Sequence, residues 1–184
     1  MIPCILAHDL GTSGNKASLF DFNGKLIGST VVSYSVYYPG RGWAEERPED
    51  WWNAVCQATK SVLEMVPDAE VSTVAVTGQM MGCLALDREG KTLGNSIIWS
   101  DSRAEAESER LVQQLTKEGY QKITGQPPSA SYTLPKILWQ KEHMPEIYRN
   151  ASVYIQAKDY INYCLTGVIA TDPTDAAYTI AYDI

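Results

Sequence analysis

Near its amino terminus the sequence reads Ile5-Leu6-Ala7-His8-Asp9-Leu10-Gly11-Thr12-Ser13-Gly14-Asn15-Lys16. The apolar residues before Asp9 predict a short strand, and the glycines and hydroxyl residues after it predict a tight turn. Backbone N–H groups in such a turn form concave arrays that bind phosphate. Glycines let that backbone come close to an anion. We therefore expect a phosphate-binding turn, and an ordinary hairpin with a surface lysine is the alternative.

The candidate nucleotide-binding residues are Asp9, Gly11, Thr12, Ser13 and Lys16. Thr12 and Ser13 add hydroxyl donors to the turn, and Lys16 places a cation at the start of the next strand. Asp9 is also the candidate metal-binding residue, because carboxylate oxygens suit Mg²⁺ or its water shell.

The residues around the turn exclude two other kinds of phosphate loop. No Gly-Lys-Ser/Thr follows a four-residue spacer, and no G-x-G-x-x-G follows a strand. The turn instead leads into a second strand, Ala17 to Phe22, which Asn23-Gly24 joins to a third, Leu26 to Val36, by a hairpin signal. The pattern therefore predicts an antiparallel meander with the phosphate turn between its first two strands.

Composition limits the class of protein. The chain has 184 residues, of which 45% are hydrophobic and 20% charged, as in globular domains. A net charge of −7 disfavours nucleic acid and anionic membranes as partners. No apolar stretch is long enough to span a membrane, and no secretory pattern opens the chain. None of the four cysteines forms a C-x-x-C pair, which favours reduced core residues of a cytoplasmic protein.

A helix is predicted to start near Pro48, with Glu49 and Asp50 in its first turn, and to be stopped by Pro67. Its predicted buried stripe consists of Trp52, Val55, Thr59, Val62, Leu63 and Val66. The β-branched run from Val71 to Thr77 predicts a central buried strand that ends at Gly78-Gln79-Met80-Met81-Gly82.

Further strands and helices then alternate. We expect a hairpin over residues 83–93, short strands at 96–99 and 153–155, and helices starting at Thr133 and Lys158. The helix from Lys158 is expected to run to Leu165 and to be stopped by Gly167. The spacing of Ser102 and Glu105 predicts a helix that runs towards Glu118 and stops at Gly119. The whole pattern predicts one α/β domain with a mixed sheet.

Several segments, in this order, resemble the amino-terminal part of the FGGY carbohydrate kinase family, most closely its xylulose kinase branch. The segments are Asp9-Leu10-Gly11-Thr12-Ser13 with Lys16, Trp43-Ala44-Glu45 with Pro48-Glu49-Asp50-Trp51-Trp52, Gly78-Gln79-Met80-Met81-Gly82, Ile98-Trp99-Ser100-Asp101-Ser102-Arg103, Pro135-Lys136-Ile137-Leu138-Trp139, Lys158-Asp159-Tyr160, and Asp172 with Thr174-Asp175-Ala176-Ala177.

The resemblance implies a ribonuclease H-like fold of the actin/hexokinase superfamily, with a mixed sheet and flanking helices. It implies ATP and Mg²⁺ as cofactors and transfer of a phosphoryl group to a hydroxyl of a small-molecule sugar. The residues that it places at the sugar are Gln79, Met80, Met81, Trp99 and Asp101. It is compatible with a homodimer and with a place in xylose metabolism.

Two departures qualify the resemblance. Xylulose kinases have Gln-Met-His-Gly where this chain has Gln79-Met80-Met81-Gly82, so another ketose or a polyol is an alternative substrate. The family's general base is an aspartate expected downstream of Ile184, so no catalytic residue is assigned within 1–184. We expect residues 1–184 to be an incomplete amino-terminal actin-like domain without kinase activity alone.

Each site residue also has a structural interpretation. Asp9 could cap a hairpin, Lys16 could be a solvated strand residue, Gln79 a buried amide and Asp101 a helix cap. Met80, Met81 and Trp99 could be core residues, and His8 is expected to be one. The rival functions are a non-catalytic actin-like nucleotide-binding module and an ATP-dependent chaperone or cell-shape relative.

Overall fold

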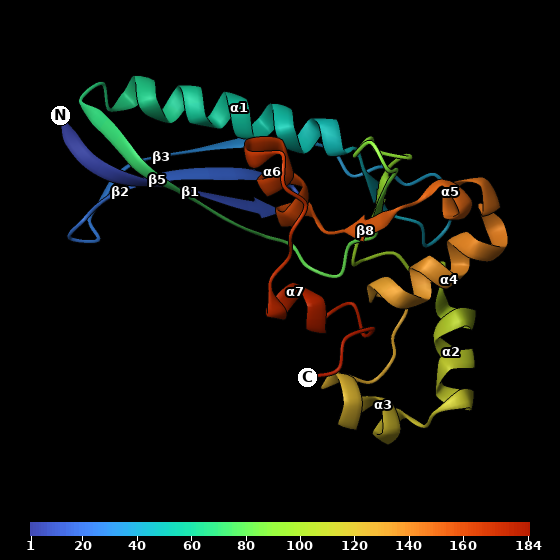
Figure 1. The fold of residues 1–184 in the computed structure, drawn as a ribbon. Coiled ribbons are helices and arrows are strands. Elements are labelled where there is room, and N and C mark those ends of the chain that lie inside the picture. The colour runs from blue at the N-terminus through green and yellow to red at the C-terminus, as the bar shows by residue number, and fades with distance from the viewer.

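A four-stranded sheet forms one part of the computed structural model, which describes residues 1–184. Its strand order is β3-β2-β1-β5. The strands are β1 (Ile2–Gly11), β2 (Gly14–Asp21), β3 (Leu26–Ser33) and β5 (Ala69–Gly78). The first three are antiparallel neighbours, whereas β5 runs parallel to β1 (Figure 1). The predicted meander and mixed sheet are thus confirmed.

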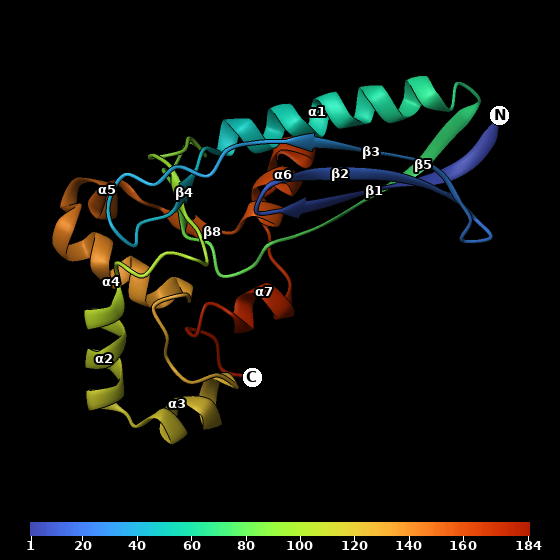
Figure 2. The ribbon, with the colours of Figure 1, turned by 180° about the vertical axis from the view of Figure 1, so that it is seen from behind.

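Helix α1 (Pro48–Met65) lies along one face of this sheet, as both sides of the molecule show (Figure 2). Its small residue Ala58 and its Val62 pack against Cys4, Leu6 and Leu19 of the sheet in one buried cluster. The predicted start of the helix is confirmed. Its stripe is partly wrong, because Trp51 and not Trp52 is the fully buried indole.

Strand β5 differs from the sequence-based expectation. Its β-branched run predicted a central strand buried on both faces, yet β5 lies at the edge of the sheet. Val71 and Val74 are exposed, because α1 packs against β2 and β3 and leaves most of β5 uncovered. The β-branched run correctly predicted a strand, but it could not predict which elements would pack beside that strand.

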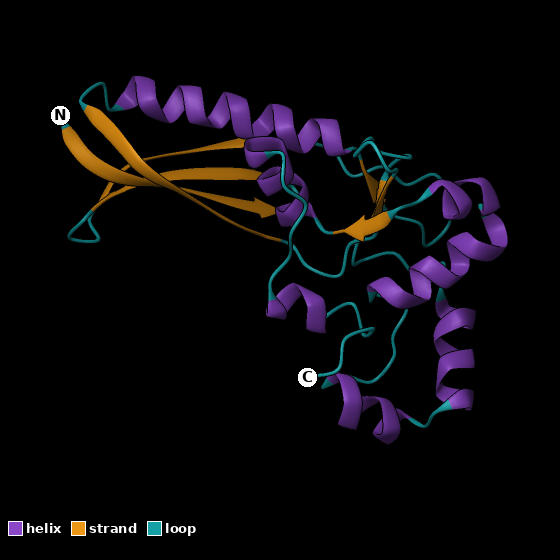
Figure 3. Ribbon diagram, viewed as in Figure 1, coloured by secondary structure: helices purple, strands orange, loops and turns teal.

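The other part of the molecule is mainly helical and lies beyond the ends of the sheet strands (Figure 3). Two small antiparallel pairs join it to the sheet. They are β4 (Glu45–Glu46) with β7 (Ser96–Ile97), and β6 (Leu84–Leu86) with β8 (Val153–Ile155). The helices are α2 (Glu105–Gln114), α3 (Lys117–Thr124), α4 (Thr133–His143), α5 (Pro145–Asn150), α6 (Ala157–Thr166) and α7 (Pro173–Ala177).

The predicted helix from Ser102 to Glu118 is two helices. It begins at Glu105 without a side-chain cap, so the capping box expected from Ser102 and Glu105 does not form. The chain leaves the helical conformation at Leu115, and Thr116 caps α3 by accepting the N–H of Gly119 at 3.1 Å. Gly119 therefore lies inside a helix and does not end one.

A shared core joins the two parts. Leu10 at the end of β1 packs in one cluster with Trp51, Leu84, Ile155 and Ile161 from α1, β6, β8 and α6. This cluster fixes the helical part against the carboxyl end of β1, which is where the predicted phosphate turn lies.

The cysteines and the helices can also be compared with the expectations from the sequence. All four cysteines are free, but only Cys4 and Cys83 are buried, while Cys56 is exposed. The expectation of core cysteines is therefore correct for part of the set. No helix combines the length and apolar character that a membrane crossing requires.

Candidate functional site at the end of the sheet

The predicted phosphate turn joins β1 to β2 through Thr12 and Ser13. Its glycines act differently from the expectation, because neither Gly11 nor Gly14 has a positive φ. A Cβ on Gly14 would lie 2.7 Å from the Val32 carbonyl oxygen of β3, so close strand packing requires this glycine. A Cβ on Gly11 would meet only the Gly14 oxygen, at 3.7 Å. That is an ordinary van der Waals distance, so packing within the chain does not require a glycine at position 11.

Asp9 and Lys16 lie directly opposite each other in the β1–β2 register, and both are exposed. Asp9 alternates along β1 with the buried Leu6, His8 and Leu10, so it lies on the face of the sheet away from α1. It takes part in no ion pair. This placement leaves its oxygens available to an external cation.

Tyr34, directly after β3, holds the turn by two hydrogen bonds. Its hydroxyl donates to the Gly11 carbonyl, and its backbone N–H donates to the Ser13 carbonyl at 3.2 Å. Burial raises the pKa of Tyr34 well above its usual value, and the negative charges of Glu46 and Asp9 raise it further. The hydroxyl therefore keeps its proton and remains a donor. Sequence reasoning missed this residue, because only the β2–β3 pairing brings it to the turn.

A chain of hydrogen bonds connects the turn to the predicted sugar residues. Trp99 Nε1 donates to Thr12 Oγ1 at 2.9 Å, and Thr12 Oγ1 donates to Gln79 Oε1 at 3.5 Å. Gln79 Nε2 donates to Glu46 Oε2 at 2.6 Å, and Trp51 Nε1 donates to the same oxygen at 2.6 Å. The fold thus brings Thr12, Gln79 and Trp99 together, although 67 and 87 residues separate the first from the other two.

Glu46 is the unexpected member of this chain. Its side chain is fully buried, and Oε1 has no hydrogen-bond partner. Burial raises the pKa of Glu46 to about 7, while the hydrogen bonds from Trp51 and Gln79 act in the opposite direction. No local pattern marks this residue, since its partner Gln79 is 33 residues away.

The turn that carries Met80 and Met81 is held by two distant side chains. Met81 has φ 66°, a left-handed conformation that L-residues rarely adopt. Gln156 Oε1 accepts its N–H at 2.6 Å, and Lys136 Nζ donates to its carbonyl at 2.6 Å. Burial lowers the pKa of Lys136 to about 8. The buried Lys136 and Gln156 therefore fix the backbone of Met81, and neither role was visible in the sequence.

Asp101 lies beside the site, and its carboxylate is hydrogen-bonded to other residues of the protein. Its carboxylate accepts the Ala44 N–H at 2.6 Å and both the backbone N–H and the guanidinium of Arg103. Arg103 also pairs with Glu45 at 2.8 Å and stacks over Trp43 at 4.0 Å. The Asp101 side chain has no solvent exposure. Its oxygens thus already accept hydrogen bonds from the loop before α1 and from Arg103, and a contact between Asp101 and a sugar stays a prediction.

His8 is a core residue, as expected. Asn15 Nδ2 lies 3.1 Å from its Nδ1, and Thr59 Oγ1 lies 3.2 Å from its Nε2. Burial lowers the pKa of His8, so the ring is neutral and bridges β2 and α1.

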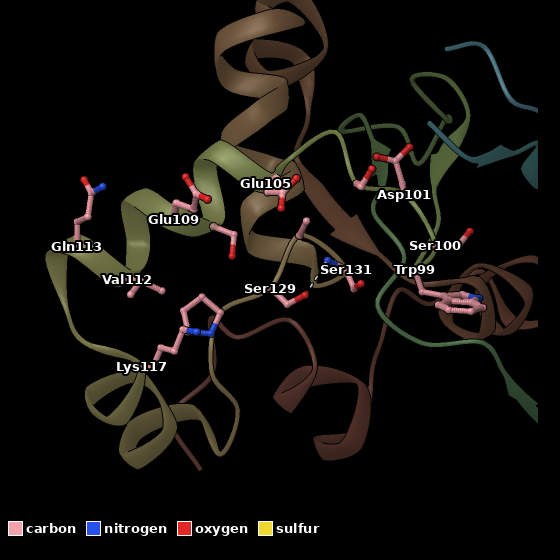
Figure 4. A pocket seen from close by; sticks show the side chains of 14 residues that line it. Trp99, Ser100, Asp101, Glu105, Glu109, Val112, Gln113, Lys117, Ser129 and Ser131 are labelled. Carbon is pink, nitrogen blue, oxygen red and sulfur yellow. Dashed lines mark hydrogen bonds between the residues drawn. The ribbon is translucent and has the colours of Figure 1, made fainter. Parts of the chain in front are cut away.

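A cavity of about 760 Å³ adjoins the site next to Trp99 (Figure 4). Its lining comes from the segment after β7, from α2, the start of α3 and the segment before α4. The lining residues are Trp99, Ser100, Asp101, Ser102, Glu105, Ser108, Glu109, Val112, Gln113, Lys117, Pro128, Ser129, Ala130 and Ser131. Of the predicted sugar residues, Trp99 and Asp101 border this cavity, whereas Gln79, Met80 and Met81 lie outside its lining. Trp99 is 42% exposed and thus forms an accessible apolar wall between the cavity and the turn.

Comparisons with known proteins agree with this geometry. A family model described as "FGGY family of carbohydrate kinases, N-terminal domain" matches residues 4–184. The chain is 32% identical over 180 residues to a xylulose kinase from Staphylococcus xylosus, covering 98% of this chain and 37% of that enzyme.

Solved structures show the same likeness. A xylulose kinase from Rhodospirillum rubrum matches with a TM-score of 0.95 and 25% identity, over 98% of this chain and 38% of that one. A gluconate kinase from Lactobacillus acidophilus matches with a TM-score of 0.94 and 28% identity, over 100% and 37%. The chain thus spans just over a third of the length of these relatives. By its sequence and its fold, the chain belongs to the FGGY family of carbohydrate kinases.

Proposed function

We propose that residues 1–184 are the amino-terminal part of an ATP-dependent kinase that phosphorylates a hydroxyl group of a sugar, a xylulose-like ketose first among the candidates. One observation carries this proposal. The 2.9 Å hydrogen bond between Trp99 and Thr12 joins the wall of the cavity of about 760 Å³ to the phosphate turn. Kinases catalyse phosphoryl transfer mainly by positioning the reactants and neutralising phosphate charge. The phosphate of the nucleotide and the hydroxyl group of the sugar must therefore bind next to each other.

Asp9, Gly11, Thr12, Ser13 and Lys16 are the proposed phosphate residues. Asp9 fits Mg²⁺ or its water shell, because it is an exposed carboxylate without an ion-pair partner beside the turn. When bound, the ion would neutralise phosphate charge. Lys16 on the same face would add a cation, and the hydroxyl groups of Thr12 and Ser13 would donate to phosphate oxygens.

Gln79, Met80, Met81 and Trp99 are the proposed sugar residues. Trp99 supplies an apolar wall, and Gln79 supplies a polar contact next to it. Met81 stands where xylulose kinases have a histidine, so a polyol or a different ketose is included in the proposal. We assign no general base among residues 1–184 and propose that the remainder of the intact protein supplies it. A cytoplasmic location, a role in xylose metabolism and a homodimer also stay proposals.

The test is ADP release by the intact protein with ATP and Mg²⁺ against a panel of pentuloses, hexuloses, polyols and aldonates. We expect turnover with at least one of them. Nucleotide binding without turnover on any panel member would contradict the proposal and favour a nucleotide-binding module.

A matched pair of variants tests the site itself. Thr12→Val keeps the shape of the side chain but removes the hydroxyl that accepts from Trp99. We expect kcat/KM for the sugar to fall roughly fivefold, since one hydrogen bond is worth about 1 kcal/mol. Thr92→Val, in the distant hairpin, makes the same chemical change and should leave kcat/KM unchanged. Equal effects of the two variants would contradict the assignment of Thr12.

A further inference from the structure

Tryptophan donors fix the direction of the hydrogen bonds at the two ends of the chain from Trp99 to Trp51. An indole N–H donates and never accepts. Trp99 therefore donates to Thr12 Oγ1, and the Thr12 hydroxyl lies 3.5 Å from Gln79 Oε1, to which it can donate its proton. At the other end Trp51 donates to Glu46 Oε2, the oxygen that also accepts from Gln79 Nε2. The Thr12 hydroxyl can donate or accept, so it is the Glu46 end that requires the Gln79 amide to place Nε2 towards Glu46 and Oε1 towards Thr12.

The contact with Glu46 constrains the orientation of the Gln79 amide more strongly than the contact with Thr12 does. Its contact with Gln79 is 2.6 Å long, whereas that between Gln79 and Thr12 is 3.5 Å. No cation pairs with Glu46, so its carboxylate depends on the two N–H donors that reach it. Above the raised pKa of Glu46, which is about 7, a flipped Gln79 amide would set its oxygen against this buried, ionised carboxylate. Two buried acceptors without a shared proton are strongly unfavourable.

We infer that Glu46 is a positioning residue that holds Gln79 with its carbonyl oxygen directed away from Glu46 and towards Thr12, so that Gln79 selects a substrate group that donates a hydrogen bond. This inference rests on the proposed function, in which Gln79 contacts the sugar. The Gln79 carbonyl can accept from a hydroxyl group of a ketose or polyol. It repels a carboxylate or carbonyl oxygen in the same place. The substrate class is therefore one that presents a hydroxyl to Gln79.

Steady-state kinetics of the intact protein test this inference. Glu46→Leu removes the acceptor and frees the Gln79 amide, and we expect KM for the sugar to rise on the order of tenfold with little change in kcat or in KM for ATP. Glu46→Gln restores an acceptor oxygen for Trp51 and Gln79 and should recover most of the affinity. Glu49→Gln, on the exposed first turn of α1, is the control and should change nothing.

A double-mutant cycle identifies the route of the effect. If Glu46 acts through Gln79, then Glu46→Leu adds no further rise in KM when Gln79 is already alanine. Additive effects would overturn the inference. If Gln79→Ala alone leaves KM unchanged, the proposed sugar site fails, which is a different result.

A spectroscopic measurement separates positioning from general destabilisation. The indole ¹H–¹⁵N resonance of Trp99, assigned with Trp99→Phe, reports on the far end of the chain of hydrogen bonds. We expect it to shift in Glu46→Leu but not in Glu46→Gln or Glu49→Gln. An unmoved Trp99 resonance in a folded Glu46→Leu protein would overturn the inference.

Discussion

Two buried carboxylates flank the site, and their surroundings differ. Asp101 accepts the guanidinium of Arg103 and two backbone N–H groups. Glu46 accepts two neutral N–H donors and has no cation beside it. Burial without a paired cation raises the pKa of Glu46. Asp101 therefore holds the loop before α1 through its ion pair and backbone contacts, whereas Glu46 orients a residue of the site.

Removing the cation from the Asp101 pair should produce the largest loss of stability. Arg103→Met leaves Asp101 and Glu45 without their shared partner, and the Arg103 side chain is only 1% exposed. Breaking a buried pair by deleting one partner costs roughly 3–5 kcal/mol. Denaturant unfolding measures the loss. Arg110→Met is the control, since Arg110 is 48% exposed and its pairs should contribute under about 1 kcal/mol. Similar losses in both variants would remove the contrast between Asp101 and Glu46.

The Glu46 side of the comparison predicts a pH dependence with a defined sign. Its pKa is raised to about 7, so the folded state binds the proton more tightly than the unfolded state. The stability that this proton contributes is therefore complete at low pH and is lost as the pH rises through about 7. At about 1.4 kcal/mol per pKa unit, the upper limit of the loss is roughly 3 kcal/mol.

Unfolding of the wild type and Glu46→Gln between pH 4.5 and 8 measures this effect. We expect the stability of the wild type relative to Glu46→Gln to fall over that range. Tyr34, the titratable neighbour of Glu46, keeps its proton throughout because its pKa is raised. A flat difference between the two proteins would show that Glu46 is ionised in the folded state at all these pH values.

The smallest expected effect on stability is at the exposed end of the chain of hydrogen bonds. Trp99→Phe keeps an aromatic wall but removes the donor to Thr12. Because the indole is 42% exposed, we expect the unfolding free energy to change by less than about 1 kcal/mol. The same variant should still raise KM for the sugar. A loss of stability comparable to that of Arg103→Met would instead show that Trp99 is a core residue, which is the alternative interpretation of this tryptophan.

The sequence predicted the parts of this molecule that depend on local chemistry. The meander, the start of α1 at Pro48 and the end of α6 before Gly167 follow from turn and capping residues, and the structure confirms them. Errors arose where neighbours decide. Gly119 resembles a helix stop but lies inside α3, and the β-branched β5 is an edge strand.

The site likewise contains residues that the sequence predicted and residues that it did not. Asp9, Thr12 and Gln79 were predicted from strand ends, where functional groups gather in sheets of this kind. Glu46, Tyr34 and Lys136 were missed, because each acts through a partner at least 23 residues away. No periodicity or local motif encodes such a contact. Only the packing of the helical part against the sheet end creates it.

We propose that the phosphate turn and the sugar-binding surface meet at the carboxyl end of β1. A crystal structure of the intact protein with a pentulose and a non-hydrolysable ATP analogue tests it most directly. We predict terminal phosphate oxygens at Thr12 and Ser13, and a sugar hydroxyl donating to Gln79 Oε1 beside Trp99. A nucleotide whose phosphates lie away from this turn, or a sugar that contacts neither Gln79 nor Trp99, would contradict the account.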